Sequence, residues 1–263
     1  MIMHVSGLSI AFMILSMIIG ILIPVILAIY FKKKYKASLL AFFTGCLVML
    51  LFAFILEQIV HAVVFASPVG TTIQGNFWLY ALYGGLMAGL FEETGRFLAM
   101  RKVLKKKLTD PHNALMYGAG HGGFEAAMLL GVGMINNLIY SVFINTGATE
   151  VLMNPLDEAT RQTLQTAFDT LVNTSPFLFL AGPIERFAAV TAQIGLSVLI
   201  WFAATKAGNI KWYITAIILH FLIDAVAVIL SSLGVAVALI EVAIWIMALA
   251  IAMIAWSVWK RNV

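Results

Sequence analysis

The stretch Phe91-Glu92-Glu93-Thr94-Gly95-Arg96 places three ionisable side chains inside an otherwise apolar run from about Phe77 to Met100. At about 1.5 Å per residue, such a run is long enough to cross a bilayer as a helix. Each charged side chain at the centre of a membrane helix costs roughly 2.5–3.5 kcal/mol. Arg96 is four residues from Glu92 and three from Glu93, so one guanidinium can partly neutralise both acids. One positive charge cannot compensate two negative charges, so one carboxylate is left without a counter-charge on this helix. This indicates either an ion-pair cluster that fixes helix packing or a functional site.

The composition places the whole chain in a membrane. Of its 263 residues, 62% are hydrophobic and only 11% are charged, and several apolar runs exceed the length of a spanning helix. The sequence therefore predicts an all-α membrane protein. Cys46 is the single cysteine, so no internal disulfide can form. The basic runs are short and lack interleaved aromatic residues, which excludes nucleic acid as a partner.

The apolar runs predict about seven transmembrane helices in one polytopic domain of residues 1–263. The expected spans are about 8–31, 37–65, 77–100, 111–145, 177–205, 212–231 and 234–259. Residues 66–76 read as a short uncharged loop. Residues 146–176 form an external segment, in which Asn154-Pro155 predicts a helix start and Leu164, Phe168 and Leu171 share one face. We expect an amphipathic helix on the outer leaflet there, acting as a connector or as a gate for substrate.

The basic residues predict the orientation. All Lys and Arg residues except Arg96, Arg161 and Arg186 fall in four segments on the same side of the seven predicted spans. These segments follow the first, third, fifth and seventh spans, and the third of them contains Lys206 and Lys211. The positive-inside rule therefore predicts an N-terminus outside the cell and a C-terminus in the cytoplasm.

Polar side chains on separate spans lie at similar predicted depths. Glu92 and Glu93, His121 and His220 are each about 12–15 Å from the cytoplasmic end of their span at the helical rise. Such agreement predicts one shared polar site inside the membrane. Glu57 and His61 are also four residues apart, but they lie toward the outer end of their span and are expected to form a structural pair.

Two of these spans contain the same local pattern, His-x-x-x-acid. It occurs as His121 to Glu125 and as His220 to Asp224, and residues four apart share a helix face. Four buried acids left charged and unpaired would cost on the order of 10–14 kcal/mol, so they must be protonated, paired or bound to a cation. A divalent metal such as Zn²⁺, with His121, Glu125, His220 and Asp224 as ligands or as partners of the ligands, would meet several of these costs.

The ordered set of motifs resembles a known superfamily. Glu-Glu-x-x-Arg from Glu92, an aromatic residue four before His121 (Tyr117), and His-x-x-x-Asp from His220 are similar to the CAAX prenyl-protein endopeptidases and their bacterial relatives, including the PrsW-type proteases. Within that group the chain most resembles the YhfC-type intramembrane metalloproteases. The resemblance implies an integral, multi-pass protein of a bacterial plasma membrane that cleaves a membrane-associated protein or peptide. It also implies that Glu92 or Glu93 activates water, beside Arg96, while the histidines bind metal or stabilise the oxyanion.

Gln193 departs from the family pattern, because a histidine is expected in that part of the fifth span. An amide is a poor metal ligand, but it can donate a hydrogen bond to an oxyanion, so Gln193 joins the candidate catalytic residues. Two alternatives stay open at this point. One is a proton- or cation-coupled transporter that uses the same acids and histidines as a relay. The other is a catalytically inactive relative that acts as a binding or immunity protein.

Overall fold

The computed structural model describes residues 3–107, 109–205 and 209–263, and every regular element among them is a helix. The predicted all-α class is therefore confirmed. Lys206 lies outside the described residues. The helices run in the order α1 (Gly7–Tyr35), α2 (Leu39–Val48), η1 (Met49–Glu57), α3 (Gln58–Phe65), α4 (Pro68–Gln74), α5 (Phe77–Lys102), η2 (Lys105–Lys107), α6 (His112–Ala126), η3 (Ala127–Val132), α7 (Gly133–Thr146), α8 (Thr149–Met153), α9 (Glu158–Asn173), η4 (Pro176–Leu180), α10 (Ala181–Thr205), α11 (Lys211–Ser232) and α12 (Val237–Lys260).

Six helical segments of the described chain are long and apolar enough to cross a membrane, which makes this an integral, multi-pass protein. They are Gly7–Tyr35, Leu39–Phe65, His112–Thr146, Pro176–Thr205, Lys211–Ser232 and Val237–Lys260. Their bounds agree with the predicted spans to within four residues. Helix α5, which carries the Glu pair, has 26 residues but is not one of the six. The seventh span and the orientation stay predictions.

Contacts between residues divide the chain into two compact units. Unit 1 comprises Met1–Leu22 and Ala126–Arg186, and unit 2 comprises Ile23–Glu125 and Phe187–Val263. The prediction of one polytopic domain is not tested by this division. All of the candidate site residues belong to unit 2.

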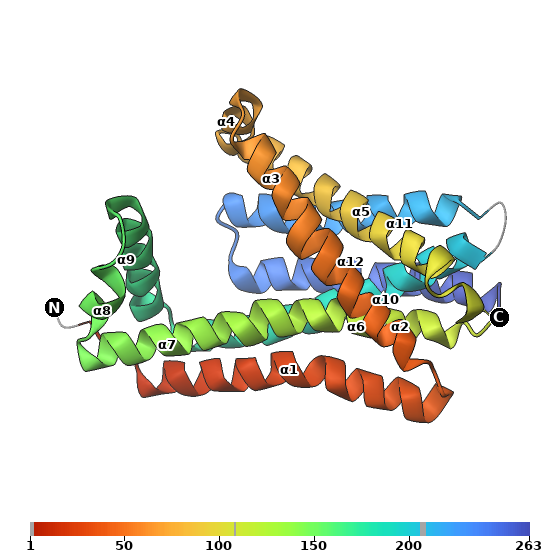
Figure 1. The fold of residues 1–263 in the computed structure, drawn as a ribbon, viewed down its shortest axis with the longest axis horizontal. Helices are drawn as coiled ribbons and strands as arrows, with labels where there is room; N and C mark the ends of the chain where they lie inside the picture. The colour runs from red at the N-terminus through yellow and green to blue at the C-terminus, as the bar shows by residue number, and fades with distance from the viewer. Residues whose placement is uncertain (1–2, 108, 206–208) are drawn as a thin grey trace. The chain divides into compact units, whose positions relative to one another are not determined.

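Helices α5 and α11 lie side by side in unit 2 and pack along much of their length (Figure 1). Glycine allows this closeness, because a Cβ atom on Gly85 would lie 2.6 Å from the carbonyl oxygen of Phe221. A Cβ atom on Gly89 would lie 2.8 Å from the carbonyl oxygen of Ile217. The two backbones are therefore close enough for short polar side chains to meet between them.

The second predicted span contains an irregularity that the apolar pattern does not indicate. Residues Met49–Glu57 form a π-helix between α2 and α3, and this wider turn packs against α5. The ring of Phe52 lies against Gly95, where a Cβ atom would approach its Cγ to 2.5 Å. The π-helix therefore covers α5 beside the Glu pair.

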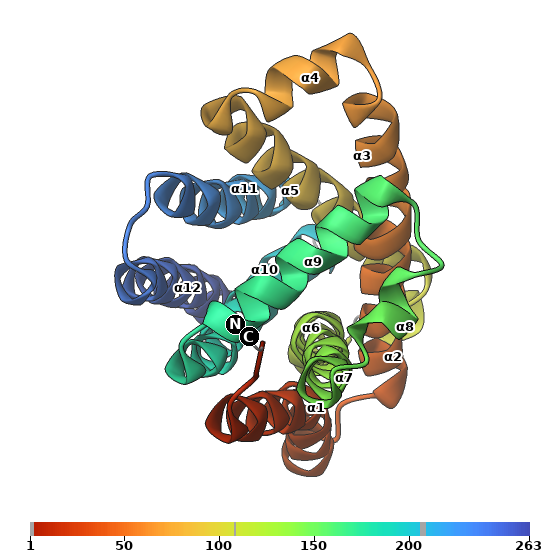
Figure 2. The same ribbon diagram turned by 90° about the vertical axis from the view of Figure 1, so that its left-hand side faces the viewer.

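Residues 66–76 are not simply a loop, which corrects the prediction. Pro68–Gln74 forms helix α4, whose N-cap Ser67 accepts a hydrogen bond from the backbone N–H of Gly70 (Figure 2). Asn76 then caps α5 by accepting hydrogen bonds from the backbone N–H groups of Trp78 and Leu79. This cap explains why α5 begins at Phe77, as predicted.

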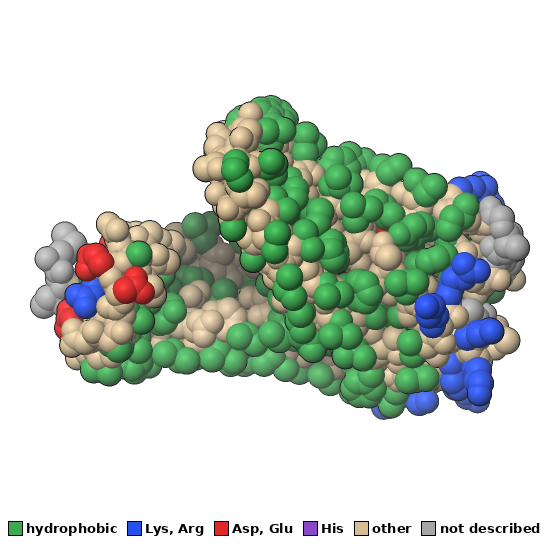
Figure 3. Space-filling model, turned by 45° about the horizontal axis from the view of Figure 1, so that its top comes forward, with side chains coloured by type: hydrophobic (Ala, Val, Ile, Leu, Met, Phe, Trp, Pro, Cys, Tyr) green, Lys and Arg blue, Asp and Glu red, His purple; other side chains and the backbone are tan. Residues whose placement is uncertain are grey.

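Apart from the buried Arg96, the described Lys and Arg side chains of unit 2 gather at one end of it, shown in blue at the right of Figure 3. They come from the end of α1, the end of α5 with η2, the start of α11 and the end of α12. The segments that the sequence assigned to one side of the membrane are therefore close together in space.

In unit 1, helix α9 is amphipathic, as predicted, but it begins later than predicted. Its N-cap is Asp157 rather than Asn154, and the backbone N–H of Thr160 donates to the Asp157 carboxylate over 2.9 Å, which lowers the pKa of this carboxyl. The apolar face of α9 is buried within the protein, since Phe168 and Leu171 join one core with Val5. Asn145 ties the first residues of the chain to α7 by exchanging two hydrogen bonds with the backbone of Val5.

Candidate functional site

Four helices of unit 2 bring the predicted site residues together. Helix α5 carries Glu92, Glu93 and Arg96, which are exposed by only 6%, 0% and 0%. The other contributors are His121 and Glu125 on α6, Gln193 on α10, and His220 and Asp224 on α11. The side chains that were grouped by their similar depth along separate spans therefore lie close together in the structure.

Glycines on α6 set its distance from α10. A Cβ atom on Gly118 would lie 2.6 Å from the Cα of Ile194, and one on Gly122 would lie 2.7 Å from the Cβ of Gln193. Because Gly122 directly follows His121, this close approach brings the Gln193 amide into the same layer as the imidazole. The glycine-rich sequence around His121 is thus explained by packing.

One oxygen of Glu92 is the common point of the site. Its Oε2 lies 2.9 Å from Nε2 of the fully buried His121, and it accepts a hydrogen bond of 3.1 Å from Nε2 of Gln193. Nε2 of His220 lies 3.8 Å from the same oxygen. Residues from α6, α10 and α11 therefore converge on one carboxylate oxygen of α5.

Glu93 makes a different set of contacts. Its Oε1 lies 2.8 Å from Nδ1 of His220 and 3.6 Å from a guanidinium nitrogen of Arg96. The other ring nitrogen of His220, Nε2, lies 3.4 Å from Oδ2 of Asp224, whose side chain is 41% exposed. His220 is thus flanked by carboxylates on both of its nitrogens, and as a protonated imidazolium it could donate to each of them.

Arg96 joins the two acids to α10. Its guanidinium lies 3.9 Å from Glu92 and donates to Gln193 twice, over 2.5 Å to the side-chain oxygen and over 3.1 Å to the backbone oxygen. Because the amide oxygen faces Arg96, the NH₂ group faces the acids, and it also donates over 3.1 Å to Glu125. The expected pairing of Arg96 with the Glu pair is present, whereas its bond to Gln193 was not foreseen.

Several buried polar atoms of this cluster have no hydrogen-bond partner among the described residues. They are Glu93 Oε2, Arg96 Nε, Tyr117 Oη and His121 Nδ1. A buried polar group without a partner costs about 1–3 kcal/mol, so native proteins contain few of them. Their concentration here is typical of a functional site rather than of a purely structural ion-pair cluster.

Two aromatic side chains support the site, and the sequence indicated only one of them. Tyr117 lies one turn before His121, and its ring stacks on the His121 ring with the two centroids 5.9 Å apart. The hydroxyl of Tyr213 on α11 is hydrogen-bonded to Thr94 over 2.6 Å, directly after the Glu pair. Tyr213 could have been suspected only from its position two turns before His220 on the same helix.

The outer pair of Glu57 and His61 is present as predicted. His61 Nε2 lies 3.1 Å from Glu57 Oε1, and His61 Nδ1 lies 2.9 Å from the hydroxyl of Tyr83. Glu57 is buried at the end of the π-helix that packs against α5. The pair therefore belongs to the helical segment next to the site but makes no hydrogen bond or ion pair with the Glu pair among the described residues.

The donors in the cluster have suitable chemistry for a divalent metal, since they are imidazoles and carboxylates. However, no group of three or more His, Cys, Asp or Glu side chains among the described residues is arranged to hold a metal ion. The predicted ligands instead contact other protein groups, because His121 and His220 face the Glu pair and Glu125 faces Gln193. The residues as placed do not fit a metal, and no catalytic step is derived through one.

The fold and this cluster define a polytopic membrane protein with acids, imidazoles, an amide and a guanidinium buried between apolar helices. The chain belongs to the YhfC intramembrane metalloprotease family, whose model matches residues 19–248. A relative from Bacillus subtilis (strain 168), described as uncharacterized membrane protein YhfC, is 38% identical over 226 residues, which cover 85% of this chain and 86% of the relative. No solved structure matches the chain. The wider resemblance to CAAX-type proteases remains a prediction.

Proposed function

We propose that this protein is an intramembrane endopeptidase that cleaves a membrane-associated protein or peptide, with Glu92 as the general base that activates water. One observation carries the proposal: Glu92 Oε2 is within 3.8 Å of donor atoms from three other helices, in a layer buried from bulk water. The family description, an intramembrane metalloprotease, supports the same class of reaction.

The division of contacts favours Glu92 over Glu93 as the base. Glu93 is completely buried and its Oε1 is occupied by Nδ1 of His220 and by the Arg96 guanidinium, so it is less accessible to a water molecule than Glu92, which is 6% exposed. Glu92 lies on the side of His121 and Gln193, which hold its carboxylate in one orientation. A carboxylate held in this way is prepared to take a proton from a water molecule beside it.

In the proposed reaction Glu92 takes a proton from water as the water oxygen bonds to the carbonyl carbon of the peptide. The carbonyl oxygen becomes an oxyanion, which accepts a hydrogen bond from Nε2 of His220 or from the Gln193 amide. Nε2 of His220 is suited to this because its contacts of 3.4 and 3.8 Å to carboxylates are longer than its 2.8 Å contact through Nδ1. The proton then passes from Glu92 to the leaving nitrogen as the carbon–nitrogen bond breaks.

A metal ion would supply Lewis-acid activation of the same water when bound. His121, Glu125, His220 and Asp224 remain the proposed ligands, although no three of them among the described residues are arranged to hold a metal ion. The steps above use only groups of the chain itself.

The experiment is a cleavage screen with purified protein in proteoliposomes, without any ion gradient. Transmembrane peptides are incubated with the wild type and with Glu92→Gln, and the products are identified by mass spectrometry. Cleavage by the wild type alone supports the proposal. Proton or cation flux that depends on Glu92, without cleavage of any peptide, would instead identify a transporter. Neither cleavage nor flux would identify an inactive relative.

A further inference from the structure

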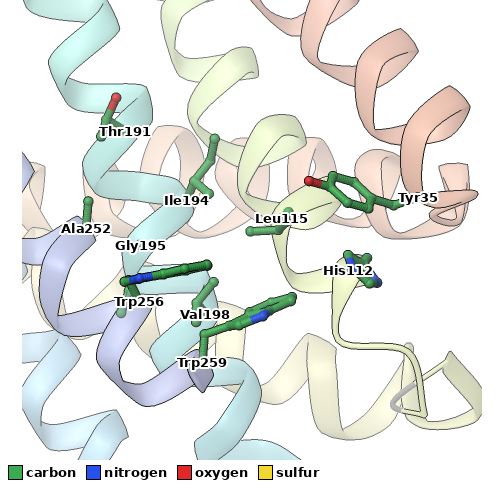
Figure 4. A pocket seen from close by; sticks show the side chains of 11 residues that line it. Tyr35, His112, Leu115, Thr191, Ile194, Gly195, Val198, Ala252, Trp256 and Trp259 are labelled. Carbon is green, nitrogen blue, oxygen red and sulfur yellow. The ribbon is translucent and has the colours of Figure 1, made fainter. Parts of the chain in front are cut away.

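A second polar and aromatic feature of unit 2 is separate from the Glu92 cluster. A cavity of about 390 Å³ lies between α1, α6, α10 and α12, which is within the range of small-molecule sites (Figure 4). Tyr35, His112, Trp256 and Trp259 contribute rings to it, and the rest of its lining is mainly aliphatic, including Val198 and Ala252. This composition suits a hydrocarbon chain with a polar end.

The aromatic rings are fixed by their own contacts. The His112 ring stacks on Tyr35 with centroids 4.4 Å apart and meets Trp259 edge-on at 5.5 Å. Asp110 holds His112 in place, because its Oδ1 lies 2.9 Å from the ring Nδ1 and accepts the His112 backbone N–H. One wall of the cavity is therefore preformed rather than assembled on binding.

Two lysines lie over rings that line this cavity, although neither lysine is itself a lining residue, and Lys34 also donates a hydrogen bond of 2.6 Å to the hydroxyl of Tyr30. The ammonium of Lys34 lies 5.2 Å from the centre of the Tyr35 ring, and that of Lys260 lies 5.1 Å from the centre of the Trp256 ring. Both rings line the cavity, and both lysines are exposed. They belong to the basic end of unit 2, where Trp and Tyr rings are expected at a membrane surface (Figure 3). The cavity thus combines an apolar interior with cations on two of its lining rings.

We propose that this cavity is a binding site for one anionic phospholipid, with an acyl chain inserted between Tyr35, Trp256 and Val198 and the phosphate held by Lys34 and Lys260. Charge complementarity selects this occupant, because basic pockets between membrane helices bind anionic head groups. The carboxylate of Asp110 is partnered by His112, so it does not oppose the phosphate as an isolated negative charge. The site is distinct from the Glu92 cluster, and its occupancy does not depend on catalysis.

The test uses the full chain reconstituted in phosphatidylcholine vesicles and titrated with phosphatidylglycerol that carries bromine on its acyl chains. Bromine quenches nearby tryptophan fluorescence, so a chain beside Trp256 and Trp259 gives a saturable loss of signal. We expect brominated phosphatidylglycerol, but not brominated phosphatidylcholine, to give this saturable component. Because each lysine near a membrane surface contributes about fivefold in affinity, Lys34→Gln combined with Lys260→Gln should weaken binding about 30-fold.

A matched control removes the same charge from the same end. Lys211 lies 5.1 Å from the Trp212 ring, much as Lys260 lies on Trp256, but Trp212 does not line this cavity. Lys102→Gln combined with Lys211→Gln should therefore bind the lipid as the wild type does. Ala252→Phe should fill the cavity and abolish the saturable component. Equal quenching by both lipids, an equal loss in the control, or unchanged quenching in Ala252→Phe would each overturn the proposal.

Discussion

Arg96 donates a 2.5 Å hydrogen bond to the side-chain oxygen of Gln193, and this contact decides which way the amide faces. With its oxygen toward the guanidinium, the amide must direct its nitrogen toward Glu92 and Glu125. Gln193 therefore connects the positive and the negative groups of the site. A residue that the sequence marked as a departure from its family thus has a specific structural role.

We predict that Gln193→Leu destabilises the protein by about 3 kcal/mol, because it removes the side-chain acceptor of the buried Arg96 and a donor to two acids. Thermal unfolding in detergent should show a midpoint lower by several degrees. Ser197→Ala is the matched control on the same helix, since its hydroxyl donates only to the Gln193 backbone oxygen over 2.8 Å. That change should cost about 1 kcal/mol. Equal midpoints for the two variants would contradict the role given to Gln193.

Glu92→Gln should lower kcat by about 10²–10⁴-fold and leave the fold intact, because an amide keeps the volume of the acid but cannot take a proton from water. Glu93→Gln should lower kcat by much less, since the completely buried Glu93 contacts His220 and Arg96 and is not the group that takes the proton in the proposed reaction. The two rates are compared with one cleaved peptide. A larger loss in Glu93→Gln would transfer the role of base to Glu93.

The spacing of α5 and α11 can be tested with two glycine positions of α5. A methyl group at Gly89 would press on the backbone of α11, whereas a Cβ atom on Gly84 would meet nothing within 4 Å. Gly89→Ala should therefore cost about 1–3 kcal/mol by overpacking and separate His220 from Glu93, so both stability and cleavage decrease. Gly84→Ala should be neutral or stabilise by up to about 1 kcal/mol through helix propensity. If Gly84→Ala is destabilised and Gly89→Ala is not, then α11 does not contact α5 at Gly89.

The sequence predicted those features that depend on one helix at a time. Apolar length located the six spanning segments, and the depth of Glu92, His121 and His220 along their helices predicted one shared layer. Helix α4 was missed although Ser67-Pro68 is a cap followed by a proline at the first turn, a signal that was available. The π-helix was not predictable, because its apolar residues fit any helix pitch. The bond between Arg96 and Gln193 depends on how α10 is rotated toward α5, which depth along a helix does not determine.

The last prediction decides whether α5 is a seventh span. Composition alone leaves α5 outside the six, but the structure pairs Glu92, Glu93 and Arg96 with groups on α6, α10 and α11, which lowers the cost of burying these charges in a membrane. We therefore expect α5 to cross, so that its two ends lie on opposite sides.

Single cysteines placed at Thr71 and at Lys105, both exposed, report on the two ends of α5. The background carries Cys46→Ala, which removes only a weak 3.3 Å contact of the thiol to the Gly120 carbonyl. With an N-terminus outside, a membrane-impermeant maleimide should label the Thr71 position in intact cells and the Lys105 position only after permeabilisation. Labelling of both positions from the same side would show that α5 does not cross the membrane. Labelling of Lys105 alone in intact cells would keep the seventh span but reverse the orientation that the basic residues predict.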